Sequence, residues 1–124
     1  MDDQRFIIEM GMGNDLHGTD YQKAATRAIE DAIRHSTLPI FLNTEIAHTE
    51  MRVAVTVGVQ EPDKLDTEAL TKGLPRGRAQ VRAVRGGQNV TDPASGETLV
   101  IATAAVEAFL PGQAGKWQMS EPQD

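Results

Sequence analysis

The sequence predicts an α/β (α+β) fold of the order β-α-β-α-β-β, with a single mixed sheet and its helices on one face. Three observations lead to this fold class. Residues 19–35 place apolar side chains at helical spacing, residues 47–59 alternate between apolar and polar side chains, and two further strand-like segments lie near the end of the chain. With 124 residues, the chain is long enough for one domain and too short for two.

The first part of the chain is expected to form a strand followed by a helix. Arg5–Met10 is a mainly apolar run that ends in a Gly-Met-Gly sequence, which is typical of a strand entering a tight turn. The helix is predicted from Thr19 to His35. Its start is marked by Thr19 and Gln22, which have the spacing of a capping box, with Asp20 as the competing N-cap.

The middle of the chain is expected to form a second strand and a short helix. Pro39 ends the helical region, and Ile40–Ile46 is either a short extended piece or an irregular connection. From Ala47 to Val59 the odd positions are mainly apolar and the even positions are mixed, which predicts the clearest strand of the sequence. Leu65–Thr71 has the spacing of a two-turn helix.

The last two predicted strands, Ala79–Arg85 and Thr98–Leu110, are separated by turn-rich sequence and are expected to form a long hairpin. Both faces of Thr98–Leu110 are nearly apolar, so this strand is predicted to be central in the sheet. We therefore expect a single α/β domain over residues 1–110. Residues 111–124 are rich in Gly, Pro, Gln and Ser and are predicted to form a flexible tail.

One long and one short helix are too few to cover both faces of such a sheet. The uncovered face is therefore expected to be closed by self-association into a homo-oligomer. Aromatic residues make up only 4% of the chain, so the core must rely on aliphatic side chains and is thin for a monomer.

Composition excludes several classes of function. The formal net charge of −6 disfavours a surface that neutralises phosphates, so no nucleic-acid partner is expected. The absence of cysteine excludes disulfides, thiol catalysis and thiolate metal sites. Neither a membrane span nor a basic signal-peptide start is visible, and we expect a cytoplasmic protein with no membrane partner.

The densest cluster of polar residues lies where the first strand is expected to lead into the helix. Its members are Glu9, Asn14, Asp15, His17, Asp20 and Lys23, interspersed with Gly11, Gly13 and Gly18. Ligands of open sheets bind at such strand ends, and glycines let the backbone approach a ligand closely. The spacing does not fit the G-x-G-x-x-G dinucleotide motif, because position 16 is Leu16 rather than glycine. The chain also has no G-x-x-x-x-G-K-[ST] motif of a P-loop, and no cofactor is predicted.

Three interpretations of this cluster remain open from the sequence. In the first, the loop is a ligand site, and His17 is a general acid or base oriented by Asp15 or Glu9, while Lys23 and Arg27 hold the charge of a substrate. In the second, carboxylates and His17 bind a metal ion, although the spacing is no known metal motif. In the third, the same residues only cap the helix and order the loop.

Charged residues elsewhere provide weaker candidates. The arginines of residues 76–85 form the basic concentration of the chain: Arg76, Arg78, Arg82 and Arg85. They could bind a carboxylate, but pairing with acidic residues at a subunit interface is favoured. Glu107 is a carboxylate in an otherwise apolar strand, where a paired partner is the ordinary expectation.

The run from Arg5 to Asp20, which contains Glu9-Met10-Gly11 and Asp15-Leu16-His17-Gly18, resembles a family of small conserved hypothetical proteins with an E-M-G-x-G-x-D-L-H-G-x-D signature. The resemblance covers nearly the whole chain and implies no assigned activity. By element order alone, the chain is also similar to the trimeric chorismate mutase-like architecture, in which small-molecule sites lie between subunits. No residue of a chorismate mutase site is matched, so this similarity implies only the fold and a homotrimer.

Together these observations predict an uncharacterised small cytoplasmic protein that binds a small polar or anionic metabolite in a cleft between subunits. One interpretation is that it is an enzyme in which His17 is the acid or base. The alternative is a non-catalytic structural or regulatory homo-oligomer whose polar loop stabilises the assembly. The expected partners are further copies of the chain, in a trimer, and a small-molecule ligand.

Overall fold

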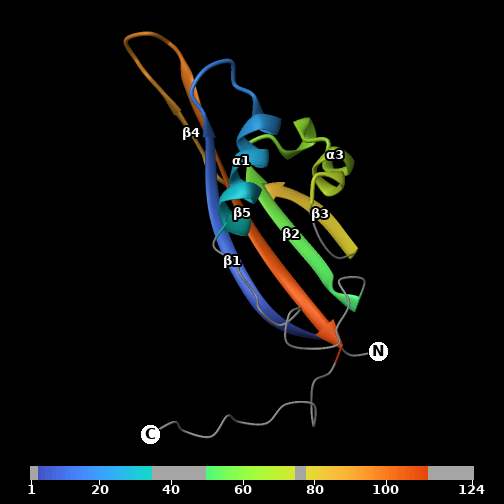
Figure 1. Ribbon diagram of the computed structural model, residues 1–124. Coiled ribbons are helices and arrows are strands. Elements are labelled where there is room, and N and C mark those ends of the chain that lie inside the picture. The colour runs from blue at the N-terminus through green and yellow to red at the C-terminus, as the bar shows by residue number, and fades with distance from the viewer. Residues whose placement is uncertain (1–2, 35–49, 75–77, 112–124) are drawn as a thin grey trace, which may run out of the picture.

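The computed structural model describes residues 3–34, 50–74 and 78–111 and confirms the predicted fold class (Figure 1). In these ranges a single mixed sheet of five strands carries two α-helices. The elements are β1 (Asp3–Asp15), α1 (Tyr21–Arg34), β2 (Arg52–Val59), the 3-10 turn η2 (Pro62–Lys64), α3 (Thr67–Lys72), β3 (Arg78–Arg85), β4 (Gln88–Thr91) and β5 (Thr98–Pro111).

The strands are arranged in the order β1-β5-β2-β3, and β4 pairs with the beginning of β5. Strand β5 runs antiparallel to both β1 and β2, which confirms its predicted central position. The predicted hairpin between the third and last strands is wrong. Strand β3 instead pairs with β2 in parallel, and β4 forms the hairpin with β5. The parallel pair requires a crossover connection, which the segment with α3 provides.

Strand β1 continues to Asp15, beyond the predicted turn at its glycines. The two glycines of the motif lie in extended backbone beneath α1. A Cβ atom at Gly11 would collide with the backbone of Ala28 and Ala32, and one at Gly13 would collide with the backbone of Ala28. In β1 glycine therefore serves close packing of the helix on the strand rather than a turn.

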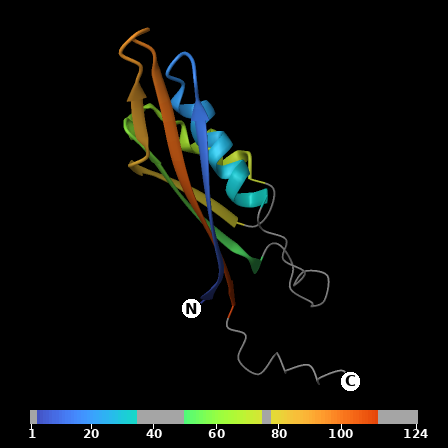
Figure 2. The ribbon, with the colours of Figure 1, turned by 90° about the vertical axis from the view of Figure 1, so that its left-hand side faces the viewer.

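The helices cover one face of the sheet, as Figure 2 shows from the side. Helix α1 buries a stripe of mostly small side chains: Tyr21, Ala24, Ala25, Ala28, Ile29 and Ala32. These pack on valines and alanines of β2 and β5, among which Val57, Val59 and Val100 are fully buried. Helix α3 adds Leu70 to the same core. The alternation predicted for the second strand is confirmed, but the strand begins at Arg52.

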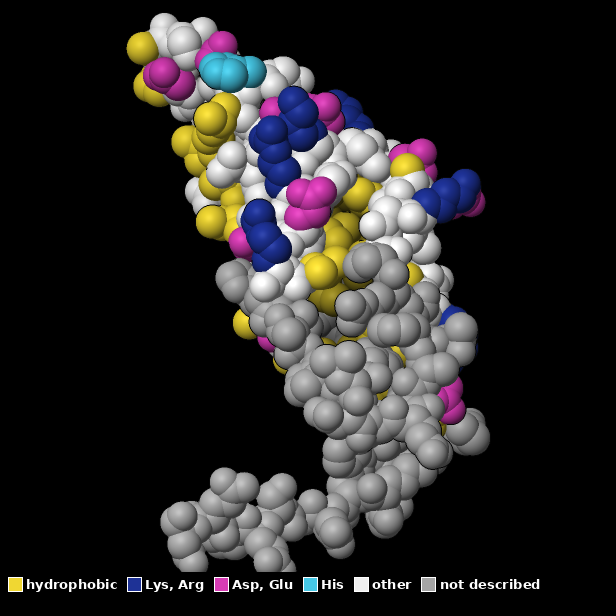
Figure 3. Space-filling model, in the orientation of Figure 1, with side chains coloured by type: hydrophobic (Ala, Val, Ile, Leu, Met, Phe, Trp, Pro, Cys, Tyr) yellow, Lys and Arg dark blue, Asp and Glu magenta, His cyan; other side chains and the backbone are white. Residues whose placement is uncertain are grey.

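The opposite face of the sheet is not covered by a helix. The uncovered sheet face is the face of the sheet opposite the helices. It consists of the exposed apolar side chains of β1 and of the side chains beside them on the other strands. The apolar members are Phe6, Ile8, Met10 and Met12, which are 38%, 43%, 71% and 59% exposed. Figure 3 shows hydrophobic side chains along the left edge of the molecule, where β1 lies in Figure 1, next to the charged side chains of the helix layer.

Several predictions fall outside the described residues. They concern Ile40–Ile46, the first part of the Ala47–Val59 strand, Arg76, and the tail after Pro111. Within the described ranges, no helix combines the length and apolar character needed to cross a membrane.

Candidate functional site

The predicted site lies at the end of β1 and the beginning of α1, where Asp15 is the central side chain. Asp15 is the last residue of β1 and is only 3% exposed. Its Oδ2 atom accepts a hydrogen bond of 2.9 Å from the backbone N–H of Asp20. The Nζ atom of Lys23 lies 4.0 Å from the other oxygen of Asp15. The carboxylate is therefore engaged in holding the loop against the helix.

Asp20, which is one of the two predicted N-caps, caps the start of α1. The Oδ1 atom of Asp20 accepts from the backbone N–H of Lys23 at 3.0 Å. Before it, Gly18 and Thr19 both have positive φ angles, of 89° and 52°. Glycine adopts this conformation readily, whereas it is uncommon for threonine. Two carboxylates, of Asp15 and Asp20, thus occupy the end of the helix dipole that would otherwise attract an anion.

The structure does not bring the three predicted catalytic residues together. Glu9 precedes Asp15 by six residues on the same strand, which separates the two residues by about 20 Å. The His17 side chain is 78% exposed, and its Nδ1 atom lies 3.3 Å from Glu97 in the β4–β5 turn. His17 is therefore next to a carboxylate, but from a distant part of the sequence that the spacing did not indicate.

The predicted ligand-binding residues on α1 and β1 contact each other instead. Arg27 donates from Nη1 to the backbone carbonyl of Asn14 at 2.7 Å. One turn further along α1, the Oδ2 atom of Asp31 accepts from the backbone N–H of Met12 at 3.0 Å. Both contacts join the helix to the same stretch of β1.

A buried polar group that sequence reasoning missed lies beside the loop. The hydroxyl group of Tyr21 donates to Glu61 at 2.8 Å and accepts from the Nδ2 atom of Asn89 at 2.8 Å. These bonds join α1, the segment before η2, and β4. The Oδ1 atom of Asn89 is buried without a hydrogen-bond partner among the described residues. No local pattern could reveal this cluster, because its members are 40 and 68 residues apart from Tyr21.

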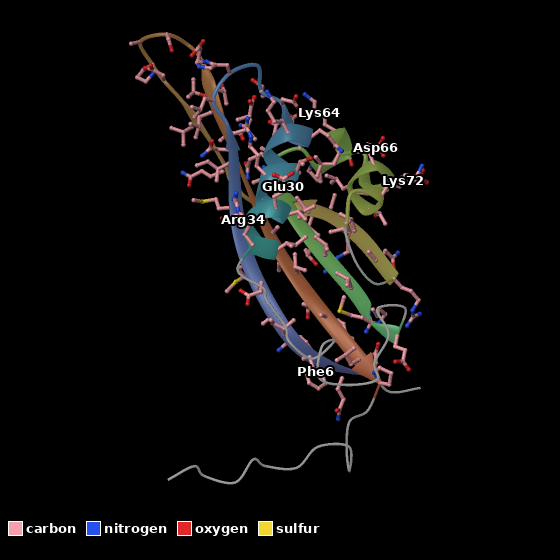
Figure 4. The ribbon with its side chains drawn as sticks, in the orientation of Figure 1. Phe6, Glu30, Arg34, Lys64, Asp66 and Lys72 are labelled. Atoms are coloured by element: carbon pink, nitrogen blue, oxygen red, sulfur yellow. The ribbon has the colours of Figure 1, made fainter. Side chains whose placement is uncertain are left out.

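Glu61 is also close to a lysine. The hydrogen bond from Tyr21 and the neighbouring Lys64, at 3.4 Å, keep the pKa of Glu61 below its ordinary value. Lys64 lies beside the start of α1 (Figure 4). An open hollow of about 340 Å³ is lined there by Gly18, Thr19, Asp20, Tyr21, Gln22 and Lys64. Gly18 and Asp20 of the predicted site belong to this hollow, but Lys64 was not predicted.

The other charged candidates lie on or near the uncovered sheet face. Glu107 is paired with Arg5 at 3.1 Å, as expected for a carboxylate in an apolar strand. Gln80 and Arg82 on β3 stand next to Ala54 and Thr56 of β2. Arg82 donates to the hydroxyl of Thr56 at 3.4 Å. Among the residues that the structure describes, no group of three His, Asp or Glu side chains is arranged to hold a metal ion.

Comparison with known proteins places the chain in a family without an assigned activity. A crystal structure at 1.22 Å resolution of an FtsZ-like protein of unknown function from Nostoc punctiforme is similar, with a TM-score of 0.77 and 34% sequence identity. The match covers 90% of this chain and 99% of that one. No curated protein matches the sequence. The family model of the conserved hypothetical proteins named Lin0512_fam matches residues 5–108. The chain therefore belongs to the Lin0512_fam family of conserved hypothetical proteins.

Proposed function

We propose that the protein is a cytoplasmic homo-oligomer, with three subunits as the sequence predicts, that assembles by burying the uncovered sheet face. The single observation that carries this proposal is the row of exposed apolar side chains on β1, from Phe6 to Met12. Contiguous apolar surface of this kind marks interaction sites on proteins. The non-catalytic alternative is favoured over catalysis, because Asp15 and Asp20 are engaged in loop and helix-capping contacts.

The size of the face fits contact between copies of the chain. Strands β1 and β5 contain 13 and 14 residues, and β2 and β3 contain 8 each. With about 3.3 Å per residue and about 4.8 Å between strands, the four strands present roughly 700 Å². Stable protein interfaces bury about 600–1,000 Å² on each partner, a range that includes this area. The face is therefore large enough for a second copy.

The middle of this face supports a flat contact with few charges, and the Arg5–Glu107 pair and Arg82 lie around it. Across the sheet from Met10 and Met12 stand Ala105 and Thr103 of β5, followed by Thr56 and Gly58 of β2. These middle positions carry small side chains on which another surface can pack closely. At the end of the sheet, Arg52 is bound to Asp3 by two hydrogen bonds, of 2.8 and 3.1 Å, so its charge is already paired.

The experiment compares the wild type with Met10→Lys by light scattering and native mass spectrometry. Met10 is largely exposed in the single chain, so the lysine should leave the subunit folded, whereas a buried lysine would oppose assembly. Leu16→Lys is the matched control, because Leu16 is 52% exposed but lies in the loop after β1. We expect a trimer for the wild type and for Leu16→Lys, and a monomer for Met10→Lys. A monomeric wild type, or a Met10→Lys variant that assembles normally, would refute the proposal.

A second candidate function, binding of a small polar ligand, is favoured by the hollow beside Lys64. Lys64 lies 3.4 Å from Glu61, but both side chains are exposed and such a pair is weak, so a carboxylate or phosphate group of a ligand can compete for the ammonium group of Lys64 on the side away from Asp20. Citrate, succinate and inorganic phosphate are suitable probes in a thermal-shift assay. We expect stabilisation of the wild type that is lost in Lys64→Ala and retained in Lys72→Ala, which removes an equally charged residue at the end of α3 (Figure 4). No shift with any probe would leave oligomerisation as the one proposed function.

A further inference from the structure

Strand β1 has a free edge. Within the described part of the sheet it pairs with β5 alone, so its other edge faces away from the sheet. In an antiparallel strand, alternate residues direct both their backbone N–H and C=O groups to the same side. An exposed row of such groups is a template on which a strand from another chain can add. The exposed apolar side chains of β1 lie beside this edge and would favour such addition.

Two side chains of α1 occupy part of this edge. Asp31 accepts from the N–H of Met12 at 3.0 Å, and Arg27 donates to the C=O of Asn14 at 2.7 Å. Met12 and Asn14 are two residues apart, so both direct these groups outward. The N–H of Met12 is a donor and meets a carboxylate, and the C=O of Asn14 is an acceptor and meets a guanidinium group. These are the same groups to which an added strand would bind.

The helix makes this arrangement rigid. Arg27 and Asp31 are one turn apart on α1, and α1 is held tightly to β1 by the contacts at Gly11 and Gly13. Asp31 is also 3.5 Å from Arg34, which limits the positions that its carboxylate can take. The two side chains are therefore held over the edge by the packing of the helix.

We infer that Arg27 and Asp31 are edge-blocking residues, which close the end of β1 to strand addition and confine contact between copies of the chain to the uncovered sheet face. The second part of this inference rests on the proposed homo-oligomer. The first part rests on the two hydrogen bonds alone and holds for a monomer as well. Without the block, copies would add edge to edge, and such contacts can continue into open assemblies.

The experiment uses the full chain with Arg27→Ala and Asp31→Ala combined, which leaves the net charge unchanged. The control combines Glu68→Ala and Lys72→Ala, which removes one acid and one base from α3 and leaves the contacts of α1 unchanged (Figure 4). In the part of the chain that the structure describes, neither control residue forms a hydrogen bond with β1. Amide hydrogen exchange at Met12, followed by NMR, reports the block. Light scattering over several days, well below the melting temperature, reports the growth of assemblies.

We expect the Met12 amide to exchange at least tenfold faster in the double alanine variant than in the wild type and the control, and the particle mass of this variant alone to increase with time. The single variant Asp31→Asn retains an acceptor oxygen and should keep the Met12 amide protected. This conservative variant therefore provides a folded comparison if the double alanine variant fails to fold. Unchanged exchange at Met12, or a constant particle mass despite faster exchange, would overturn the inference.

The wild-type mass tests the proposed oligomer separately. A wild-type trimer with a stable double variant refutes only the edge block, and a monomeric wild type with a growing double variant refutes only the oligomer.

Discussion

At the scale of single residues, the two glycines of β1 allow α1 to lie directly on the strand. Each position faces the helix backbone, where even one methyl group has no space. The helix in turn presents alanines to the sheet at Ala24, Ala28 and Ala32. Small residues on both surfaces therefore determine how close the two layers come, and close packing makes such positions sensitive to added volume.

We expect Gly13→Ala to lower the free energy of unfolding by about 1–3 kcal/mol, because the methyl group must displace α1. The measurement is urea denaturation followed by circular dichroism. Gly73→Ala is the control: Gly73 has a φ of −78°, and an added Cβ would be 3.6 Å from its nearest neighbour. This substitution should be neutral or stabilise by up to about 1 kcal/mol. Equal effects of the two substitutions would contradict the packing role of Gly13.

The hydroxyl group of Tyr21 supports the second residue-scale prediction, which concerns pH. The bond from Tyr21 lowers the pKa of Glu61 below its ordinary value of 4.5 in the folded state. A lowered carboxyl pKa stabilises the fold fully above the unfolded value, and this contribution is lost as the pH falls through the folded value. Tyr21→Phe should therefore reduce the melting temperature more at pH 7 than at pH 3.

The control for this pH dependence is the same substitution in a Glu61→Gln background. Glutamine does not titrate, so the effect of Tyr21→Phe should then be similar at both pH values. The remaining cost, which comes from leaving the Asn89 amide without its partner, is about 1–3 kcal/mol for a buried polar group. A pH dependence that survives in the Glu61→Gln background would show that another group is responsible.

At the scale of elements, the connection between β1 and α1 is organised by carboxylates rather than by its histidine. Asp15 is buried and accepts from the backbone of Asp20, and Asp20 caps the helix. His17 projects outward to Glu97, which directly precedes β5 in the β4–β5 turn. Both views of the ribbon show this hairpin reaching the loop (Figures 1 and 2).

We expect Asp15→Ala to destabilise the protein by about 1–3 kcal/mol, because a part-buried hydrogen bond to a carboxylate, from the N–H of Asp20, is lost. His17→Ala should change stability by no more than about 0.5 kcal/mol, because exposed side chains contribute little. Thermal and urea denaturation of the two variants are the measurements. A larger loss for His17→Ala than for Asp15→Ala would contradict this account of the loop.

At the scale of the whole molecule, the sheet is covered by helices on one face and exposes apolar side chains on the other. The aliphatic core beneath α1 and α3 is continuous, but it is built largely from alanine and valine. Burial of the uncovered sheet face between subunits would add apolar contacts that a single chain does not provide. Stability and assembly should therefore be coupled.

If they are coupled, the melting temperature of the wild type will rise with protein concentration, since mass action favours the assembled and folded state. We expect a measurable rise over a hundredfold range of concentration by differential scanning fluorimetry. The Met10→Lys variant should melt at a temperature that does not depend on concentration, and Leu16→Lys should behave as the wild type. A melting temperature of the wild type that is independent of concentration would argue against coupled assembly.

Local patterns in the sequence predicted most of the elements. The helical spacing after Tyr21, the alternation through Val53, Val55 and Val57, and the apolar faces of β5 all correspond to observed elements. These predictions hold because each depends only on the spacing of apolar side chains within one segment that packs against the core. The strand pairing was not predictable in this way. Strand β3, in which apolar and polar side chains largely alternate, has no local feature that selects β2 over β5 as its neighbour.

The sequence by itself determined the fold class, the central place of β5 and the dense polar loop before α1, because hydrophobic periodicity and capping residues act within a segment. Only the tertiary structure decided which groups in that loop meet. It separated Glu9 from Asp15, paired His17 with Glu97, and joined Arg27 to the backbone of Asn14. The physical reason is that hydrogen bonds and ion pairs are made with neighbours in space. Those neighbours are decided by how α1 and the β4–β5 hairpin pack against β1, which no single segment encodes.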